Sequence, residues 1–227
     1  MDPRKLAAEG LGTFTLVFGG SLSILAAAAF GGAAQVAIAF GFGLSLLAGL
    51  YAFGEISGGH FNPAVSLAFM LSGRLSPNDM IGYWIAQVVG GVAGSFAVLI
   101  AFGSDDVART TTQASASWDA LWLELLLTMI FVAVILQSSR SERVYGTALL
   151  AIPLTLVAIH LAAIPFSGAS VNPVRSFAAA VVGTEFSDLW IYLVGPPIGA
   201  AIGAIVHRYL YETDVEVREV DVVEVRP

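Results

Sequence analysis

The 227-residue chain contains no cysteine, and only 12% of its residues are charged. The lack of cysteine excludes disulfides, thiolate metal sites and a cysteine nucleophile. A soluble domain carries roughly 25% charged residues. Because 57% of the residues are hydrophobic and the mean hydropathy is +0.82, water is not the main solvent for this chain.

Charged residues are missing from three long stretches, 10–54, 80–104 and 144–174. Each stretch exceeds the ~18 apolar residues that mark a membrane-spanning helix. The 24 glycines suit close contacts between helices in lipid. These features predict an all-α membrane protein. The six spans that we expect cover about residues 6–28, 34–54, 82–103, 118–138, 145–164 and 189–210.

The distribution of basic residues predicts the orientation in the membrane. An even number of spans places both ends of the chain on one side. Among the connecting loops, only Arg109 clearly falls on the other side. Because positively charged loops stay in the cytoplasm, we expect both termini to be cytoplasmic and the protein to lie in the cell membrane. The basic residues on the terminal side are Arg4, Lys5, Arg74, Arg140, Arg143 and Arg208.

Two further apolar segments, 56–73 and 165–183, are not predicted to span the membrane. Each contains a glycine-bearing stretch, then Asn-Pro, then about ten residues that favour a helix. Asparagine is a strong N-cap, and proline is well tolerated at the first helical position. The segments therefore predict two short re-entrant half-helices, which are allowed at membrane depth where they are buried or line a water-filled path.

The two segments are also copies of each other at a constant offset of 110 residues. Six residues of the first recur in the second: Ser57, Gly58, Asn62, Pro63, Ser66 and Ala68 recur as Ser167, Gly168, Asn172, Pro173, Ser176 and Ala178. The flanking spans match as well. Glu9, Thr13, Gly90 and Gly94 correspond to Glu124, Thr128, Gly199 and Gly203. Chance similarity between glycine-rich apolar segments is the alternative.

This repeat predicts the organisation of the whole chain. Three spans per copy is an odd number, so the second copy enters from the opposite face. Such an inverted repeat has its functional site at the midplane, where the copies meet. We expect one transmembrane channel domain over 1–210, with repeats at about 4–103 and 118–210. The acidic segment 211–227 is expected to be a solvated cytoplasmic tail.

The residues at the two Asn-Pro boxes resemble those of the aquaporin family. Ser-Gly-Gly-His-Phe-Asn-Pro-Ala-Val (57–65) and Ser-Val-Asn-Pro-Val-Arg-Ser (170–176) are similar to the paired boxes of that family, and the resemblance covers residues 4–210. In detail the chain looks most like bacterial water channels. It departs from the family at Val174, where alanine is usual. The resemblance implies the aquaporin fold, a homotetramer in membrane lipid, and water as the permeant.

The physics of the paired boxes predicts a barrier to protons. Two half-helices that enter from opposite sides bring their positive N-terminal ends together. Asn62 and Asn172 are expected to cap these ends with their side-chain oxygens and to turn N–H groups toward the lumen. A water that accepts from both would point its own hydrogens outward, which breaks a proton wire. The converging dipoles would also repel cations.

The resemblance also implies roles for six further residues. Phe42, His160, Ala169 and Arg175 fall at the selectivity filter, and Ala169 replaces the threonine or cysteine common in close water channels. Glu9 and Glu124 match carboxylates that support the re-entrant loops by accepting backbone N–H bonds. Proton carriage by these two carboxylates is the alternative.

Three classes of function agree with these features. A passive water channel that excludes protons and ions is favoured. A glycerol or small neutral solute facilitator is the alternative. Such facilitators typically have aspartate after the filter arginine, whereas Ser176 follows Arg175 here. Leu193, where water channels often carry tryptophan, mildly favours the facilitator. An ion-coupled transporter or membrane enzyme is disfavoured, because no catalytic triad, metal cluster or phosphate loop is visible. No enzyme activity, cofactor, metal or nucleic-acid partner is expected.

Overall fold

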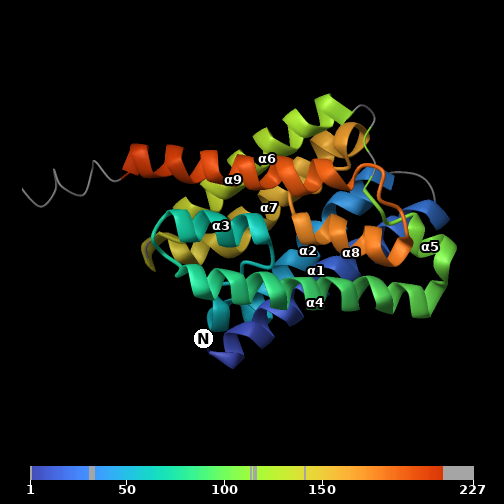
Figure 1. Ribbon diagram of the computed structural model, residues 1–227, viewed down its shortest axis with the longest axis horizontal. Helices are drawn as coiled ribbons and strands as arrows, with labels where there is room; N and C mark the ends of the chain where they lie inside the picture. Colours follow the sequence, from blue (N-terminus) through green and yellow to red (C-terminus); the bar gives the residue numbers. More distant parts are fainter. Residues whose placement is uncertain (1, 31–33, 113, 115–116, 141, 212–227) are drawn as a thin grey trace, which may run out of the picture.

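The computed structural model describes residues 2–30, 34–112, 114, 117–140 and 142–211, and this part of the chain is helical without strands. Figure 1 shows the arrangement of its helices. Their bounds are α1 Pro3–Phe30, α2 Ala34–Ser57, α3 Pro63–Leu71, α4 Pro77–Phe102, α5 Ser104–Ala108, α6 Ser117–Ser138, α7 Glu142–Ser167, α8 Pro173–Gly183 and α9 Leu189–Tyr211. The predicted acidic tail lies outside the described residues, except for Tyr211.

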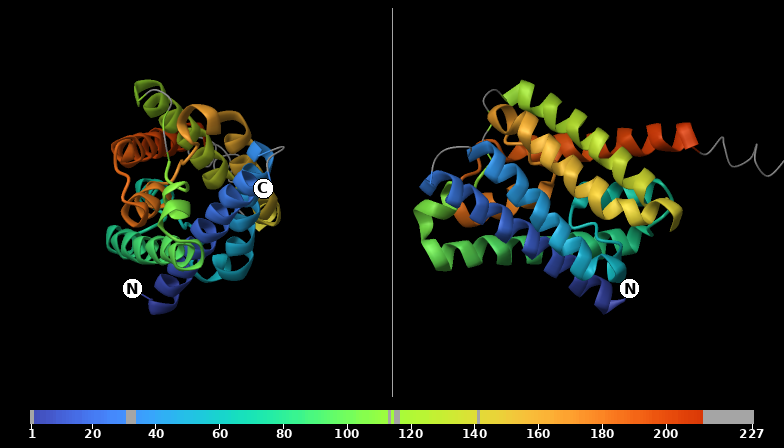
Figure 2. Two further views of the ribbon diagram at one scale, coloured as in Figure 1. Left: turned by 90° about the vertical axis from the view of Figure 1, so that its right-hand side faces the viewer. Right: turned by 180° about the vertical axis from the view of Figure 1, so that it is seen from behind.

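Six of these helices, α1, α2, α4, α6, α7 and α9, are long and apolar enough to cross a membrane, which confirms the predicted spans. They run side by side along the long axis of the molecule (Figure 2). Most of these helices extend beyond a predicted end, because apolar windows mark the hydrocarbon core and not the caps. Helix α4, for example, begins at Pro77, where the Ser76 hydroxyl accepts a hydrogen bond from the Asp79 N–H at 3.1 Å. The short helix α5 was not predicted.

The half-helices α3 and α8 begin at the two Asn-Pro boxes. Asn62 and Asn172 are N-caps, and Pro63 and Pro173 are the first helical residues. With 9 and 11 residues, the two helices are too short to span a membrane. Figure 1 shows them entering from opposite ends of the molecule and meeting near its middle. The predicted aquaporin fold is therefore confirmed.

Packing follows the symmetry of the inverted repeat. In the first repeat α1 packs against α2 and α4, and in the second α6 packs against α7 and α9. The repeats join where α2 meets α7. Each half-helix packs mainly on the third span of the other repeat, α3 on α9 and α8 on α4. The two repeats are therefore interlocked around the boxes.

Glycines bring the first and third spans of each repeat into close contact. A Cβ atom built on Gly90 would overlap the carbonyl oxygen of Gly10, and one on Gly199 would overlap that of Leu125. Gly10 and Leu125 are themselves equivalent residues of the two repeats. These glycines therefore serve packing within one chain, where only a hydrogen fits between the backbones.

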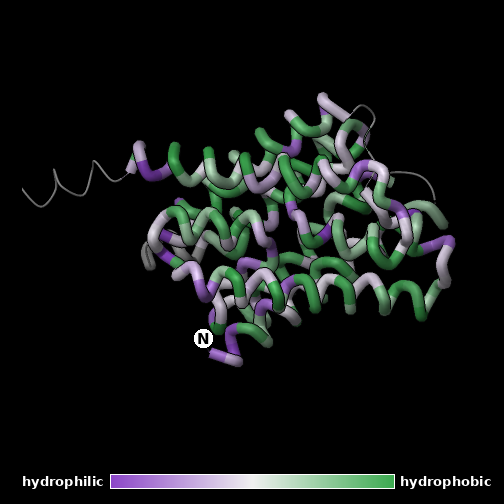
Figure 3. Tube along the Cα trace, in the orientation of Figure 1, coloured by the Kyte–Doolittle hydropathy of each residue, from purple (hydrophilic) through white to green (hydrophobic). Residues whose placement is uncertain are grey.

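The outer surface is apolar and the ends are polar. Hydrophobic residues cover most of the length of the long helices, and hydrophilic residues gather toward both ends of the molecule (Figure 3). Large apolar side chains such as Tyr51, Ile100 and Trp118 are exposed. Several polar side chains lie fully buried instead, among them Glu9, Gln87 and Glu124. This inside-out pattern suits a bundle surrounded by lipid that carries its polar chemistry in the interior.

Candidate functional site

A cavity lies in the interior and is lined by residues of both repeats. The spans α1, α2, α6 and α7 form its wall, and both box loops form the opposite side. Apolar side chains dominate the wall, while the loops contribute most of the polar groups. The polar residues on the cavity are His60, Asn62, Ser139, His160, Ser170, Asn172 and Arg175.

The two box asparagines face each other at the centre of this cavity. The Asn62 Oδ1 accepts from the Ala64 N–H at 2.9 Å, and the Asn172 Oδ1 accepts from the N–H groups of Val174 and Arg175. Each Nδ2 donates to the opposite loop: Asn62 to the carbonyl of Val171 at 2.8 Å, and Asn172 to that of Phe61 at 3.0 Å. Each amide carries two N–H groups. One N–H of each asparagine therefore has no acceptor among the described residues.

Two buried carboxylates hold the loops before the boxes. Glu9 accepts hydrogen bonds from the Ser57 hydroxyl at 2.7 Å and from the backbone N–H groups of His60 and Phe61 at 2.9 and 2.8 Å. The carboxylate and all of these donors are buried. This set of bonds holds the first loop against α1.

The second loop repeats this arrangement. Glu124 accepts from the Ser167 hydroxyl at 2.8 Å and from the N–H groups of Ser170 and Val171 at 2.8 and 2.7 Å. Both oxygens of each carboxylate are thus occupied by the backbone that leads into a box. The carboxylates satisfy N–H groups that would otherwise be buried without partners.

The bonds to these carboxylates hold the backbone in an uncommon conformation. Phe61 and Val171, which precede the two asparagines, have φ of 47° and 45°. Non-glycine residues rarely adopt left-handed angles, and a β-branched residue such as valine does so least readily. The loops therefore depend on their hydrogen-bond partners for their shape.

Sequence reasoning missed three further residues that fix the loops. The Gln87 Nε2 donates to Glu9 at 2.8 Å, and this bond has no equivalent in the second repeat, where Pro196 occupies the matching position. The hydroxyls of Tyr83 and Tyr192 donate to the carbonyls of Ser57 and Ser167, both at 2.7 Å. Gln87 could have been found as a lone amide in an apolar span.

Three predicted filter residues lie together at one end of the cavity. The rings of Phe42 and His160 stack with centroids 4.6 Å apart, and the Arg175 guanidinium lies 4.9 Å from the Phe42 centroid. The His160 Nδ1 lies 3.0 Å from the carbonyl of Leu156. Because a carbonyl only accepts, the hydrogen of the neutral ring is on Nδ1, and Nε2 is an acceptor. This buried Nε2 has no hydrogen-bond partner in the part of the chain that the structure describes.

Arg175 is held by a hydroxyl and not by a carboxylate. Its Nη1 donates to the Thr112 hydroxyl at 2.9 Å, and that hydroxyl in turn donates to Ser176. In the described part of the chain no carboxylate lies within ion-pair distance of this guanidinium. Its charge therefore lies beside the cavity without a direct ion pair to any described carboxylate. Sequence reasoning missed Thr112, because it lies 63 residues away in a loop without a recognisable motif.

The fourth predicted filter residue, Ala169, differs from the other three. It has a left-handed φ of 51°, and its side chain is fully buried. Ser170, the next residue, lines the cavity, whereas Ala169 does not. The structure therefore brings Phe42, His160 and Arg175 together at the cavity, whereas Ala169 is buried and is not one of the residues that line it.

Val174, the departure from the usual box, is buried against α4. A Cβ atom on Gly91 would lie 2.6 Å from the Cγ1 atom of Val174. The residues equivalent to Val174 and Gly91 under the inverted repeat are Ala64 and Ala200, both fully buried. Val174, the larger of the two box residues, thus faces Gly91, the smaller of the two residues on the long helices.

Six membrane-length helices around an internal cavity define a polytopic membrane protein. The described residues include no group of three His, Cys, Asp or Glu side chains that could hold a metal ion. The family model described as "Major intrinsic protein" matches residues 2–207. The chain therefore belongs to the major intrinsic protein family.

Bacterial relatives resemble the chain along nearly its whole length. It is 41% identical to Aquaporin Z of Brucella melitensis over 93% of this chain and 99% of the relative. It is 42% identical to Aquaporin Z of Photorhabdus laumondii, over 92% of this chain and 97% of the relative. It is 39% identical to Aquaporin Z of Bradyrhizobium diazoefficiens, over 93% of this chain and 95% of the relative. Among solved structures, the aquaglyceroporin from Plasmodium falciparum shares the fold. Its TM-score is 0.78 at 23% identity, over 96% of this chain and 98% of that chain.

Proposed function

We propose that this protein is a passive channel that conducts water along an osmotic gradient and excludes protons and ions. The observation that carries the proposal is the pair of box asparagines. Each has one amide N–H that is used by the opposite loop and one that is not, and both residues line the same cavity. The relatives named Aquaporin Z support the same function.

The spare N–H groups explain how water passes while protons do not. A water molecule at the centre accepts from Asn62 and Asn172, so its lone pairs are occupied and its hydrogens point toward the two mouths. Waters on either side must then accept from it, and the file has opposite orientations in its two halves. Proton hopping needs one continuous donor-to-acceptor chain, which this reversal interrupts. The N-terminal ends of α3 and α8 add positive potential at the same place.

The filter residues select by charge and by width. The Arg175 guanidinium, which has no direct ion pair to a described carboxylate, repels cations in a region of low dielectric, where the repulsion is much stronger than in water. The His160 Nε2 offers an acceptor and Arg175 offers donors, so a water can exchange its bulk hydrogen bonds for these. The Phe42 ring closes the remaining side. A solute larger than water has to displace this wall.

The proposal is tested in proteoliposomes with a trapped pH dye. Shrinkage after an osmotic step should be faster than in protein-free liposomes, and the internal pH should stay constant under a pH gradient. Acidification in step with the water flux would overturn the barrier. A glycerol gradient forms the second arm: glycerol flux as fast as water flux would assign the chain to the facilitators of small neutral solutes.

The proposal also covers the oligomeric state of the protein and its orientation in the membrane. We propose a homotetramer in the cell membrane, with both termini in the cytoplasm and one channel domain per chain. Both described ends lie at the same end of the molecule (Figure 1), which also carries Arg74, Arg140 and Arg208. Positively charged ends face the cytoplasm. Light scattering in detergent would test the tetramer, and protease access to the C-terminus in oriented vesicles would test the placement.

A further inference from the structure

A second, polar pocket lies at the end of the molecule where the described chain ends. Its wall combines the loop after α3, the end of α6 and the last turns of α9, so both repeats contribute. Its volume is about 340 Å³. The residues that line it are Ser72, Arg74, Leu136, Arg140, His207, Arg208 and Tyr211. Three of these are arginines and none is acidic.

Two arginines of this pocket are fixed in place by neutral groups. The Arg74 guanidinium donates to the carbonyls of Leu136 and Ser139 at 3.2 and 2.7 Å. The Arg140 Nη2 donates to the carbonyl of Tyr211 at 2.8 Å, and its guanidinium lies 5.2 Å from the centroid of the Tyr211 ring. Within the described ranges, no carboxylate lies within ion-pair distance of Arg74 or Arg140. The Ser72 hydroxyl, which also lines this pocket, is buried without a hydrogen-bond partner among the described residues.

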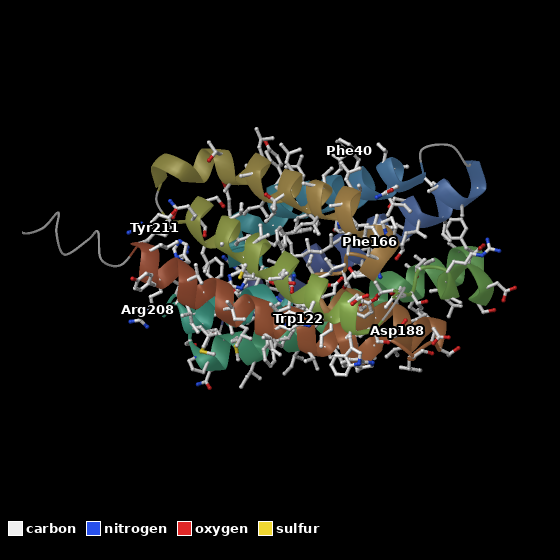
Figure 4. The ribbon with its side chains drawn as sticks, turned by 90° about the horizontal axis from the view of Figure 1, so that it is seen from above. Phe40, Trp122, Phe166, Asp188, Arg208 and Tyr211 are labelled. Carbon is white, nitrogen blue, oxygen red and sulfur yellow. The ribbon has the colours of Figure 1, made fainter. Side chains whose placement is uncertain are left out.

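The chain continues from the rim of this pocket into an acidic segment. Tyr211, whose carbonyl and ring contact Arg140, is followed directly by residues 212–227. This segment carries six carboxylate side chains and two arginines. Residues 212–216 span at most about 18 Å when extended, so their carboxylates can reach any wall of the pocket. Figure 4 shows Tyr211 and Arg208 at this end of α9, with Asp188 near its other end. The acidic residues are Glu212, Asp214, Glu216, Glu219, Asp221 and Glu224.

We infer that the pocket is a docking site for the chain's own acidic segment, which places carboxylates of Glu212, Asp214 and Glu216 against the guanidinium groups of Arg74 and Arg140. Three arguments favour this occupant. The charges are complementary, the covalent link keeps the local concentration of carboxylate high, and the segment starts at the rim. A free segment of this charge would also be repelled by the anionic inner surface of a membrane.

A single labelled cysteine tests the docking, because the chain has no other cysteine. A nitroxide at Val215→Cys should give a broad, immobilised spectrum at low salt. Arg140→Gln should lower the ratio of docked to free label by roughly fivefold, the effect of one lost charge pair. About 1 M salt should free the label as well, since it screens charges beyond about 3 Å. Arg109→Gln is the matched control, because Arg109 pairs with Asp106 and lies outside the pocket.

A second variant keeps the test independent of any damage to the folded part. Glu212→Gln with Asp214→Asn and Glu216→Gln leaves the pocket intact and should free the label to the same extent as salt does. A label that is equally mobile in all backgrounds overturns the proposal. The spectra should also be the same in neutral and in anionic bilayers. Release of the label by anionic lipid alone would assign the pocket to lipid phosphates instead.

Discussion

At the scale of single residues, Val174 and Gly91 form a pair whose sizes are matched. The Val174 methyl group occupies the space that a side chain on α4 would need. The equivalent positions, Ala64 and Ala200, both carry alanine and are both fully buried. A packed contact of this kind depends on summed volume and not on either residue alone.

This pairing predicts a compensating double substitution. Gly91→Ala should lower the free energy of unfolding by about 1–3 kcal/mol, because its methyl group would lie 2.6 Å from the Val174 Cγ1. Adding Val174→Ala should restore most of the loss. Thermal unfolding in detergent measures both. Equal midpoints for Gly91→Ala and the wild type would show that the contact is looser than described.

A second prediction at the scale of single residues concerns His160, whose ring sets the width of the cavity beside Arg175. His160→Ala removes both the imidazole ring that stacks on Phe42 and the Nε2 acceptor of that ring. We expect the ratio of glycerol to water flux to rise by about tenfold, the usual effect of relieving one steric contact in a selective site. Stopped-flow measurements on the same proteoliposomes give this ratio.

Ile159→Ala is the matched control for this substitution. Ile159 is buried in the same helix but does not line the cavity, so its flux ratio should stay at the wild-type value. An unchanged ratio in both variants would place the narrowest point elsewhere.

At the scale of elements, the loops before α3 and α8 depend on carboxylates in other helices. Glu124→Gln keeps the size but replaces one acceptor oxygen by an N–H donor. That donor would face the N–H of Ser170 or Val171, which then loses its partner in a buried site. We expect a loss of stability of about 1–3 kcal/mol. The box loop should loosen, and water flux should fall with it.

Glu55→Gln is the control for this prediction, because it makes the same chemical change at an exposed residue. Thermal unfolding and stopped-flow light scattering on both variants decide the outcome. A Glu124→Gln protein as stable and as conductive as Glu55→Gln would remove the support role from this carboxylate.

The elements themselves were largely predictable from sequence. Spans and half-helices follow from apolar length and from the Asn-Pro caps, which are local signals. Apolar length alone places the start of α4 at about residue 82, whereas the helix begins at Pro77, and Ser76 with Asp79 carried a usable capping signal. The bonds from Arg175 to Thr112 and from Gln87 to Glu9 join distant parts of the chain. Such pairs follow from tertiary packing and leave no local pattern.

At the scale of the whole molecule, the structure predicts which wall of a helix meets the permeant. Leu156 and Leu154 both belong to α7, but Leu156 lines the cavity and Leu154 is 55% exposed on the outside. Since the chain has no cysteine, each can be replaced by a single thiol. A mercurial should block water flux through Leu156→Cys, and a reducing thiol should restore it.

Leu154→Cys serves as the control for this experiment, because it carries the same substitution two residues away. It should react with the mercurial and still conduct at the untreated rate. Mass spectrometry confirms the modification in each case. Block of Leu154→Cys, or normal flux through modified Leu156→Cys, would contradict the placement of the path.

The exchange of half-helices between the repeats has a consequence for biosynthesis. Helix α3 is made early by the ribosome, but the surface that covers it belongs to α9, the last helix described. While the chain is being inserted, α3 is therefore a short apolar helix that still lacks its main partner. A chain terminated before α9 would therefore hold every residue that lines the cavity and still lack the main surface against which α3 packs.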